Sequence, residues 1–447
     1  MYEKSPWTAV GVLAFAVAVG TLQMTAVVPM LPVLQRQLAV PLTSASWTLT
    51  AALLSGAVAI PLLARLGDLY GRRPVALAAL GLLVTGSLLS AMATTLPLVI
   101  AGRVLQGMAA PLLPLAMGIV RQRVSRALLP TAIGVLSAMM GVGSGAGMIL
   151  AGLVGGTYQA LFWILAALGA VALALVALLV PEPVRPAPGG RPDLAGAALV
   201  TGWLVCLLLA ISKGASWGWT SAPTLGLLAA CAALVAAWVT TARRTPSPLI
   251  EISMLLHRAT VGATVASLLI GFALFGTITT LSSVAQGTLG ASVLQVGLYL
   301  LPTALLMLAV SLSAGRLMRR FSASSLVGAG SSLVAVATLW LSVSHGGSAD
   351  LYGAATVLGL GIGLAYAALG TMAVEHVAPA ETAAAGGVNA LVRVIGSSLA
   401  GAVSAAVLSG AGAGWSFAAS AIAAVLSAVF GYTHGALARG QTAEEPA

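Results

Sequence analysis

Two long apolar stretches of this chain are joined by Ala64-Arg65-Leu66-Gly67-Asp68-Leu69-Tyr70-Gly71-Arg72-Arg73-Pro74. The segment is dense in Gly and Arg and holds a single acid. Charged side chains are costly inside a hydrocarbon layer, so a segment of this kind between two membrane-length helices belongs at a membrane edge. The stretch therefore predicts an integral membrane protein whose second and third apolar spans are joined here.

The composition agrees with a membrane protein. Of the 447 residues 59% are hydrophobic and only 7% are charged, with a mean hydropathy of +1.05, whereas soluble domains average about 25% charged residues. The net charge of +10 does not indicate nucleic-acid binding, because the arginines are scattered in small groups at the ends of apolar spans. Cys206 and Cys231 each fall within an apolar span, so no disulfide and no metal site is expected.

The fold class predicted from hydropathy is an all-α integral membrane protein. A helix needs about 20 apolar residues to cross the bilayer core, and the chain offers about fourteen such stretches. The first apolar run, from Trp7 to about Leu31, is too long for a signal peptide and is expected to remain as a helix. The expected spans are 7–30, 43–64, 75–94, 97–119, 129–155, 159–180, 194–212, 222–240, 259–285, 293–315, 323–343, 350–374, 384–409 and 413–434.

The distribution of cations predicts the orientation. With the N-terminus in the cytoplasm, 16 of the 20 Lys and Arg fall on the inner side, Arg36 and Lys213 fall in outer loops, and Arg103 and Arg393 lie within spans. Cytoplasmic segments of membrane proteins carry an excess of Lys and Arg. We therefore expect a multi-pass protein of the cell membrane with both termini in the cytoplasm.

A weak internal repeat predicts the domain organisation. The segment 314–321 aligns with 63–70, and each follows the second helix of an apparent six-helix group, although Arg319 stands where the first copy has Asp68. The expected units are a six-helix bundle at 1–182, a linker with two inserted helices at 183–257, and a second six-helix bundle with a short tail at 258–447. Residues 181–192 are Pro-rich and read as the linker, and Arg243–Arg258 reads as a surface-lying connector.

The segment 64–74 resembles the loop signature G-x-L-x-D-R-x-G-R-R of the major facilitator superfamily, and it lies between the second and third spans, as in that family. The resemblance implies two pseudo-symmetric bundles around a central cavity that opens alternately to each side. It also implies that the glycines allow a tight turn, that the acid caps or pairs, and that the arginines hold the loop in the cytoplasm. The conformational-switch residues implied in this way are Gly67, Asp68, Gly71, Arg72 and Arg73.

A glycine series in the fifth span resembles the family's antiporter motif G-x-x-x-G-P-x-x-G-G, with Met148 in place of the proline and Ala151 in place of the first glycine of the closing pair. Small residues at this spacing let helix backbones approach closely. The glycines either let neighbouring helices slide past one another during transport or only allow them to pack closely. The glycines concerned are Gly141, Gly143, Gly145, Gly147 and Gly152.

Residues 103–107 are similar to the family's R-x-x-Q-G motif. Two further segments resemble the fourteen-helix drug:proton antiporter branch: residues 22–32 are similar to its first-helix signature, and 386–396, with Asn389 and Arg393, also look like that branch. Gln23 and Arg103 lie about 10 Å and 9 Å from the outer ends of their helices, so they could share a cavity. Each residue also has a purely structural alternative. Gln23 could form a hydrogen bond between helices, and Arg393 could be a structural residue that donates to backbone carbonyls. The expected substrate-cavity residues are Gln23, Thr25, Arg103, Gln106, Asn389 and Arg393.

The position of the acids limits the substrate. None of the ten Asp and Glu falls in the middle of a span, and Gln23 stands where the branch often has an Asp. A transporter of cationic drugs usually needs a buried carboxylate to attract the cation and carry the proton. The resemblance implies an exporter working by alternating access in the lipid bilayer, and the absence of a mid-span acid predicts that its substrates are neutral or anionic amphiphilic molecules.

The resemblance implies coupling to protons, and we expect a monomer without cofactor, metal or nucleic-acid partner. Two alternatives remain at this stage: a facilitator or importer of a metabolite, and a membrane sensor or enzyme. No catalytic set is visible within the spans, because all four His lie at or outside span ends. The chain is therefore not expected to be an enzyme.

Overall fold

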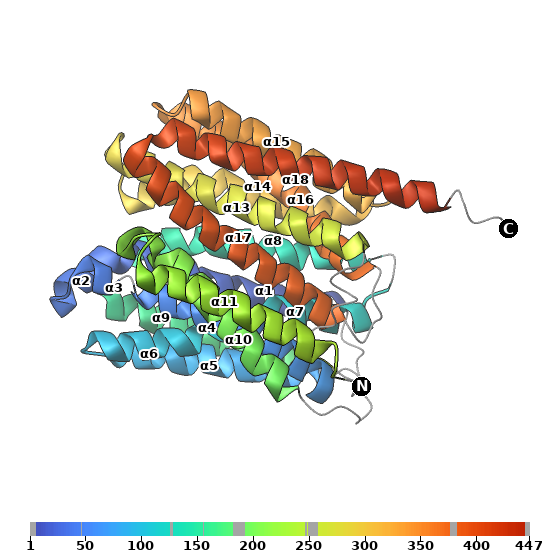
Figure 1. The fold of residues 1–447 in the computed structure, drawn as a ribbon, viewed down its shortest axis with the longest axis horizontal. Coiled ribbons are helices and arrows are strands. Elements are labelled where there is room, and N and C mark those ends of the chain that lie inside the picture. Colours follow the sequence, from blue (N-terminus) through green and yellow to red (C-terminus); the bar gives the residue numbers. More distant parts are fainter. Residues whose placement is uncertain are drawn as a thin grey trace.

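The computed structural model describes residues 6–442, except for 46, 126–127, 155, 182–192, 246–247, 249–257 and 376–381. Every regular element in this part of the chain is a helix, which confirms the all-α membrane fold (Figure 1). The expected linker 181–192 and connector 243–258 lie largely outside the described residues.

The first group of helices runs from the start of the described chain to Leu179. Its members are α1 (Pro6–Ala26), the 3-10 turn η1 (Val28–Met30), α2 (Leu31–Leu38), α3 (Leu42–Ala45), α4 (Trp47–Tyr70), α5 (Arg72–Met92), α6 (Leu96–Gly107), α7 (Leu112–Arg123), α8 (Leu129–Val154) and α9 (Tyr158–Leu179).

Two helices follow, and then a second group. The pair is α10 (Leu194–Trp217) and α11 (Ala222–Ala242). The second group is α13 (Arg258–Gly287), α14 (Val293–Leu317), α15 (Ala323–Val343), α16 (Ser348–Glu375), α17 (Thr382–Gly410) and α18 (Ala413–Thr442).

The helices match the expected spans in number and order. Within the described residues, 13 helices are long and apolar enough to cross a membrane, with α6 and α7 forming one span, and α14 carries a shorter apolar stretch at Leu294–Val310. Several boundaries differ from the expectation by a few residues, such as those of α4, which covers Trp47–Tyr70 where the sequence predicts 43–64. Two further differences fall at prolines. The first helix ends at Ala26, before the turn that holds Pro29, and the fourth span is interrupted between Gly107 and Leu112, where Pro111 lacks the amide hydrogen that would continue a helix.

The helices pack within each of the two groups and also across them, with α8 and α14 forming one of the most extensive helix pairs in the described structure. α8 packs against α14 and α16, while α17 packs against α4 and α7. The inserted helix α10 contacts both α4 and α17, so it covers the seam between the groups on that side. Apolar side chains fill this corner, among them Ile60, Val200, Leu204, Val388 and Leu391.

Lys213 does not lie in an outer loop as expected. It is the fifth residue from the end of α10 and is buried, with its Nζ 4.3 Å from the centre of the Trp47 ring in α4. One residue earlier, the Ser212 hydroxyl lies 3.2 Å from the Thr50 hydroxyl. These contacts fix this end of α10 to α4.

Candidate functional site

The segment 64–74 is almost entirely helical. α4 continues to Tyr70, α5 begins at Arg72, and Gly71 alone separates them, with a φ of 105° that glycine adopts readily and other residues avoid. The expected turn is thus a single residue. The acid and the arginines of the segment therefore stand on rigid helix ends.

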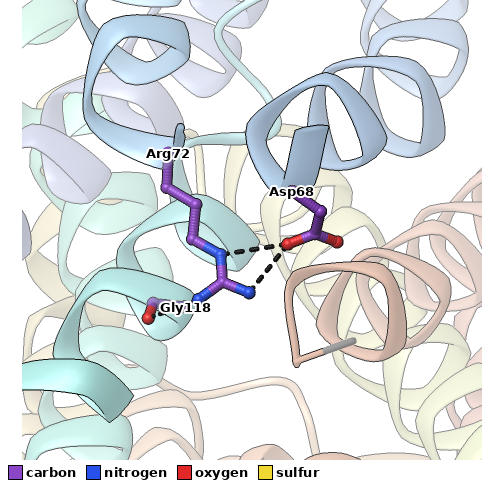
Figure 2. Close-up of polar contacts among 3 residues, drawn as sticks. All are labelled: Asp68, Arg72 and Gly118. Carbon is purple, nitrogen blue, oxygen red and sulfur yellow. Dashed lines mark hydrogen bonds and ion pairs between the residues drawn. The ribbon is translucent and has the colours of Figure 1, made fainter. Parts of the chain in front are cut away.

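Asp68 and Arg72 form a buried ion pair between the end of α4 and the start of α5. The Arg72 Nε and Nη2 atoms donate to Asp68 Oδ1 at 3.0 and 2.7 Å, and Nη1 donates to the Gly118 carbonyl of α7 at 2.9 Å (Figure 2). The two side chains are only 7% and 5% exposed. A side chain at Gly118 would collide with the Arg72 guanidinium, so Arg72 would have to leave this position to make room for it.

The neighbouring arginine extends the same cluster. Arg73 Nη2 donates to the Ala177 carbonyl near the end of α9 at 2.6 Å. Gly67 lies so close to α7 that an added Cβ would come within 2.5 Å of Leu115 Cδ2. The expected switch residues therefore connect α4 and α5 with α7 and α9.

A second polar cluster surrounds Arg103, which is fully buried in α6. Its Nη1 donates to the Gln23 Oε1 at 2.7 Å, to the Gln23 carbonyl at 3.1 Å and to the Gln106 Oε1 at 2.6 Å, while Nε donates to the Thr48 carbonyl at 3.0 Å. Gln106 Nε2 in turn donates to the Ser87 hydroxyl of α5 at 2.7 Å. All the acceptors are neutral oxygens, and they connect Arg103 to α1, α4 and, through Gln106, α5.

A central cavity of about 220 Å³ lies between the two groups of helices. Its wall is formed by α1, α4, α7, α8, α13, α14, α16, α17 and the interruption between α6 and α7. Most of its side chains are apolar, for example Met24, Leu113, Met140, Phe275 and Met307. Its polar lining residues are Thr21, Thr25, Ser144, Thr303, Tyr366, Arg393, Ser397 and Ser398.

The predicted cavity residues divide into two sets. Thr25 and Arg393 line the cavity, as do Gly141 and Gly145 of the glycine series. Gln23, Arg103 and Gln106 form the buried cluster beside it, and Asn389 donates to the Ser267 hydroxyl of α13 at 2.6 Å. Their roles in transport stay predictions.

Tyr366 was not anticipated from the sequence. It lines the cavity from α16, and the Arg393 guanidinium carbon lies 4.7 Å from the centre of its ring. No carboxylate is present among the described lining residues, so Arg393 supplies the charge on this wall.

The cavity is closed toward the end of the molecule that holds Asp68. There α17 crosses α4 and α7 closely: a Cβ on Gly387 would lie 3.3 Å from Ala64 Cβ, and one on Gly386 would lie 3.5 Å from Pro114 Cβ. Among the lining residues, Leu53 of α4 and Phe275 of α13 are 37% and 36% exposed. The close crossing at Gly386 and Gly387 is what closes the cavity at the Asp68 end.

The glycines of α8 face two different partners. A methyl group on Gly143 or Gly147 would overlap the α1 carbonyls of Ala18 or Leu22. Gly141, Gly145 and Gly152 face α14 instead, at Met307, Ala304 and Leu294. The series therefore packs α8 tightly within the first group and also along the second.

Comparison with known proteins adds a family match. The model of the Major Facilitator Superfamily matches residues 13–401. The chain is 29% identical over 341 residues to the tetracenomycin C resistance and export protein of Streptomyces glaucescens, a match covering 75% of this chain and 63% of that protein. It is 28% identical over 383 residues to the multidrug resistance protein Stp of Mycobacterium tuberculosis (strain CDC 1551 / Oshkosh), covering 85% of this chain and 71% of Stp.

A solved structure supports the fold. The human organic anion transporter MFSD10 (TETRAN) superimposes with a TM-score of 0.72 at 17% identity, over 96% of this chain and 100% of the other. At that identity the likeness concerns the fold alone. The match to the tetracenomycin C protein spans less than two thirds of that relative's length.

Proposed function

This chain belongs to the major facilitator superfamily, and from that premise we propose that it exports neutral or anionic amphiphilic small molecules by alternating access. The observation that carries the proposal is the central cavity, which is mostly apolar, lies between two groups of helices and is closed at one end. Relatives named for tetracenomycin C export and multidrug resistance support an exported, drug-like substrate.

The lining of the cavity supports the choice of substrate charge. A cation that enters would meet the Arg393 guanidinium and would find no carboxylate among the described lining residues. Charges interact strongly where water is scarce, so the repulsion disfavours cationic substrates. Neutral and anionic amphiphiles meet no such penalty.

The remaining parts of the proposal rest on the resemblance and on the charge pattern. We place the protein in the cell membrane as a monomer with cytoplasmic termini, and we propose that protons drive export. In this scheme the Asp68 cluster stabilises the outward-open state, because it ties together helix ends on the side where the cavity is closed.

Reconstitution tests the proposal. The full chain in proteoliposomes is assayed with tetracenomycin C, tetracycline and ethidium, with and without an imposed pH gradient, and with protein-free liposomes as the control. We expect transport of at least one of the first two compounds that the gradient accelerates, and weak or absent transport of ethidium. Robust gradient-driven ethidium transport would contradict the assigned charge preference.

A further inference from the structure

We propose that Arg393 is the point in the cavity where an acidic oxygen of the substrate binds, such as a carboxylate, sulfonate or phenolate carried on an apolar ring system. The proposal deepens the export function and rests on it, because it names the chemical class that the cavity would hold. It assigns Tyr366 as the residue that positions Arg393.

The first argument is how firmly Arg393 is held. Gly271 of α13 lies so close that an added Cβ would come within 2.7 Å of the Arg393 carbonyl oxygen and 2.9 Å of its Cγ. The guanidinium end lies over the Tyr366 ring of α16. The side chain is therefore held between α13 and α16, and its charged end has a defined position on the cavity wall.

The second argument is what the guanidinium lacks. Arg393 is only 4% exposed, and within the described part of the chain its Nε has no hydrogen-bond partner. A guanidinium offers five N–H donors around its edge, and stacking on a ring occupies a face while leaving that edge available. A planar acidic group can accept two parallel hydrogen bonds from such an edge.

Arg103 differs from Arg393 in its partners and its position. Arg103 is equally deep in the protein, but neutral oxygens of Gln23, Gln106 and Thr48 accept from its Nε and Nη1, only its Nη2 lacks a partner among the described residues, and it does not line the cavity. Arg393 has the open space of the cavity beside it instead of such acceptors. A substrate is the partner that this geometry favours.

The neighbouring surface suits the rest of such a molecule. Phe275, Leu274 and Ile278 of α13 and Met307 of α14 offer apolar contacts, while the hydroxyls of Ser397 and Ser398 lie on the same helix as Arg393, about one turn further on. An apolar ring system with one acidic substituent fits this combination of surfaces.

A pair of fluorescent probes tests the proposal. The purified full chain in phosphatidylcholine nanodiscs is titrated with 1-anilinonaphthalene-8-sulfonate, an anion, and with N-phenyl-1-naphthylamine, its neutral counterpart, against empty discs. We expect Arg393→Gln to weaken binding of the anionic probe by about tenfold or more, with the neutral probe changed less than about twofold. Arg393→Lys, which keeps the charge, should weaken the anionic probe less than Arg393→Gln does.

Three further variants separate positioning from general damage. Tyr366→Phe keeps the ring and should bind the anionic probe as the unmodified protein does, whereas Tyr366→Leu should bind it more weakly. Arg316→Gln removes an exposed arginine at the end of α14, outside the cavity, and should leave both probes unchanged. If Arg393→Gln does not fold, Arg393→Lys and the two Tyr366 variants carry the test.

The outcomes distinguish this proposal from the export function. Equal losses for both probes in Arg393→Gln, no loss for the anionic probe, or no binding of the anionic probe to the unmodified protein would each overturn the anion site. If phosphatidylglycerol in the discs abolishes the difference between the unmodified protein and Arg393→Gln, the site takes a lipid headgroup and the proposal also fails. Arg393-dependent binding without transport of any compound would leave the anion site standing and remove the export function.

Discussion

At the scale of single residues, the contact between Gln23 and Arg103 determines what a substitution at position 23 would do. The Gln23 Oε1 lies 2.7 Å from Arg103 Nη1, and Gln23 does not line the cavity. A carboxylate introduced at this position would therefore face Arg103 and form an ion pair with it. Such a variant tests the Arg103 cluster rather than creating a cation site in the cavity.

Asp68→Asn is the sharpest single-residue test of the Asp68 cluster. The carboxylate accepts two hydrogen bonds from Arg72, and removing its charge leaves a nearly buried guanidinium without its counter-ion. Exposed ion pairs are worth about 0–1 kcal/mol, but disrupting a buried one costs more. We expect slower transport in proteoliposomes with expression near that of the unmodified protein.

The matched control is Asp350→Asn, which removes the same charge at the start of α16. Asp350 accepts from Trp340 Nε1 at 3.2 Å and from the Ser344 hydroxyl at 2.8 Å, away from both the cavity and the Asp68 cluster. Its transport rate should stay unchanged. Unaltered kinetics in Asp68→Asn would count against a role for Asp68 in switching.

At the scale of helices, the two faces of α8 predict different responses to the same substitution. Gly143→Ala places a methyl group on the Ala18 carbonyl of α1, and overpacking of this kind costs about 1–3 kcal/mol. Gly145→Ala places its methyl group 3.3 Å from Ala304 Cβ, a contact that a small shift relieves. Replacing glycine with alanine at position 145 also raises helix propensity, which stabilises the helix by roughly 0.5–1 kcal/mol.

Thermal unfolding in detergent measures the difference between these two variants. The midpoint should fall for Gly143→Ala and stay near that of the unmodified protein for Gly145→Ala. Equal midpoints would mean that the packing of α8 against α1 is looser than its backbone spacing indicates.

The sequence predicts where the helices lie along the chain, but it does not predict which face of each helix points toward lipid, a neighbouring helix or the cavity. The thickness of the bilayer fixes the length of each span, so hydropathy alone places most boundaries within a few residues. These helices are apolar on nearly every side, so helical periodicity does not distinguish faces toward lipid, a neighbouring helix or the cavity. For this reason Arg103 and Arg393 look alike in sequence, although the structure places one in a closed cluster and the other on the cavity wall.

Some missed features had a visible signal. Pro111 marks the interruption of the fourth span, and the continuation of α4 to Tyr70 is compatible with charged residues because a helix can project beyond the bilayer edge. No signal in the sequence pointed to Tyr366, because a single tyrosine in an apolar span can either line a cavity or contact a neighbouring helix. Its role depends on the approach of α13, α16 and α17, whose residues lie far apart in sequence.

At the scale of the whole molecule, the inserted helices bear on how the halves can move. α10 is fixed to α4 through Lys213 with Trp47 and through Ser212 with Thr50, and it also packs against α17. The proposed alternating access requires that α4 and α17 move relative to each other. We infer that α10 stays with α4 and slides along α17, where its contacts are apolar side chains.

An engineered cross-link at the closed end tests this motion. Ala64 of α4 and Gly387 of α17 lie opposite each other, with 3.3 Å between Ala64 Cβ and the Cβ that Gly387 would carry. Disulfides have Cβ atoms about 3.5–4.5 Å apart, so a small adjustment brings this pair into range. The variant combines Ala64→Cys and Gly387→Cys in a background where Cys206 and Cys231 are replaced by Ala.

Oxidation of the double variant should hold the cavity closed at the Asp68 end and stop transport in proteoliposomes, and reduction should restore it. Each single variant under the same oxidant is the control, since neither can bridge the two helices and both should keep transporting. The oxidised double variant, fully cross-linked, is compared with the same variant after reduction of the disulfide. If both transport at the same rate, α4 and α17 do not separate during the cycle. The substrate would then have to pass without opening of the end where Gly387 meets Ala64, and a rocking motion of the two halves about the cavity would be excluded for this protein.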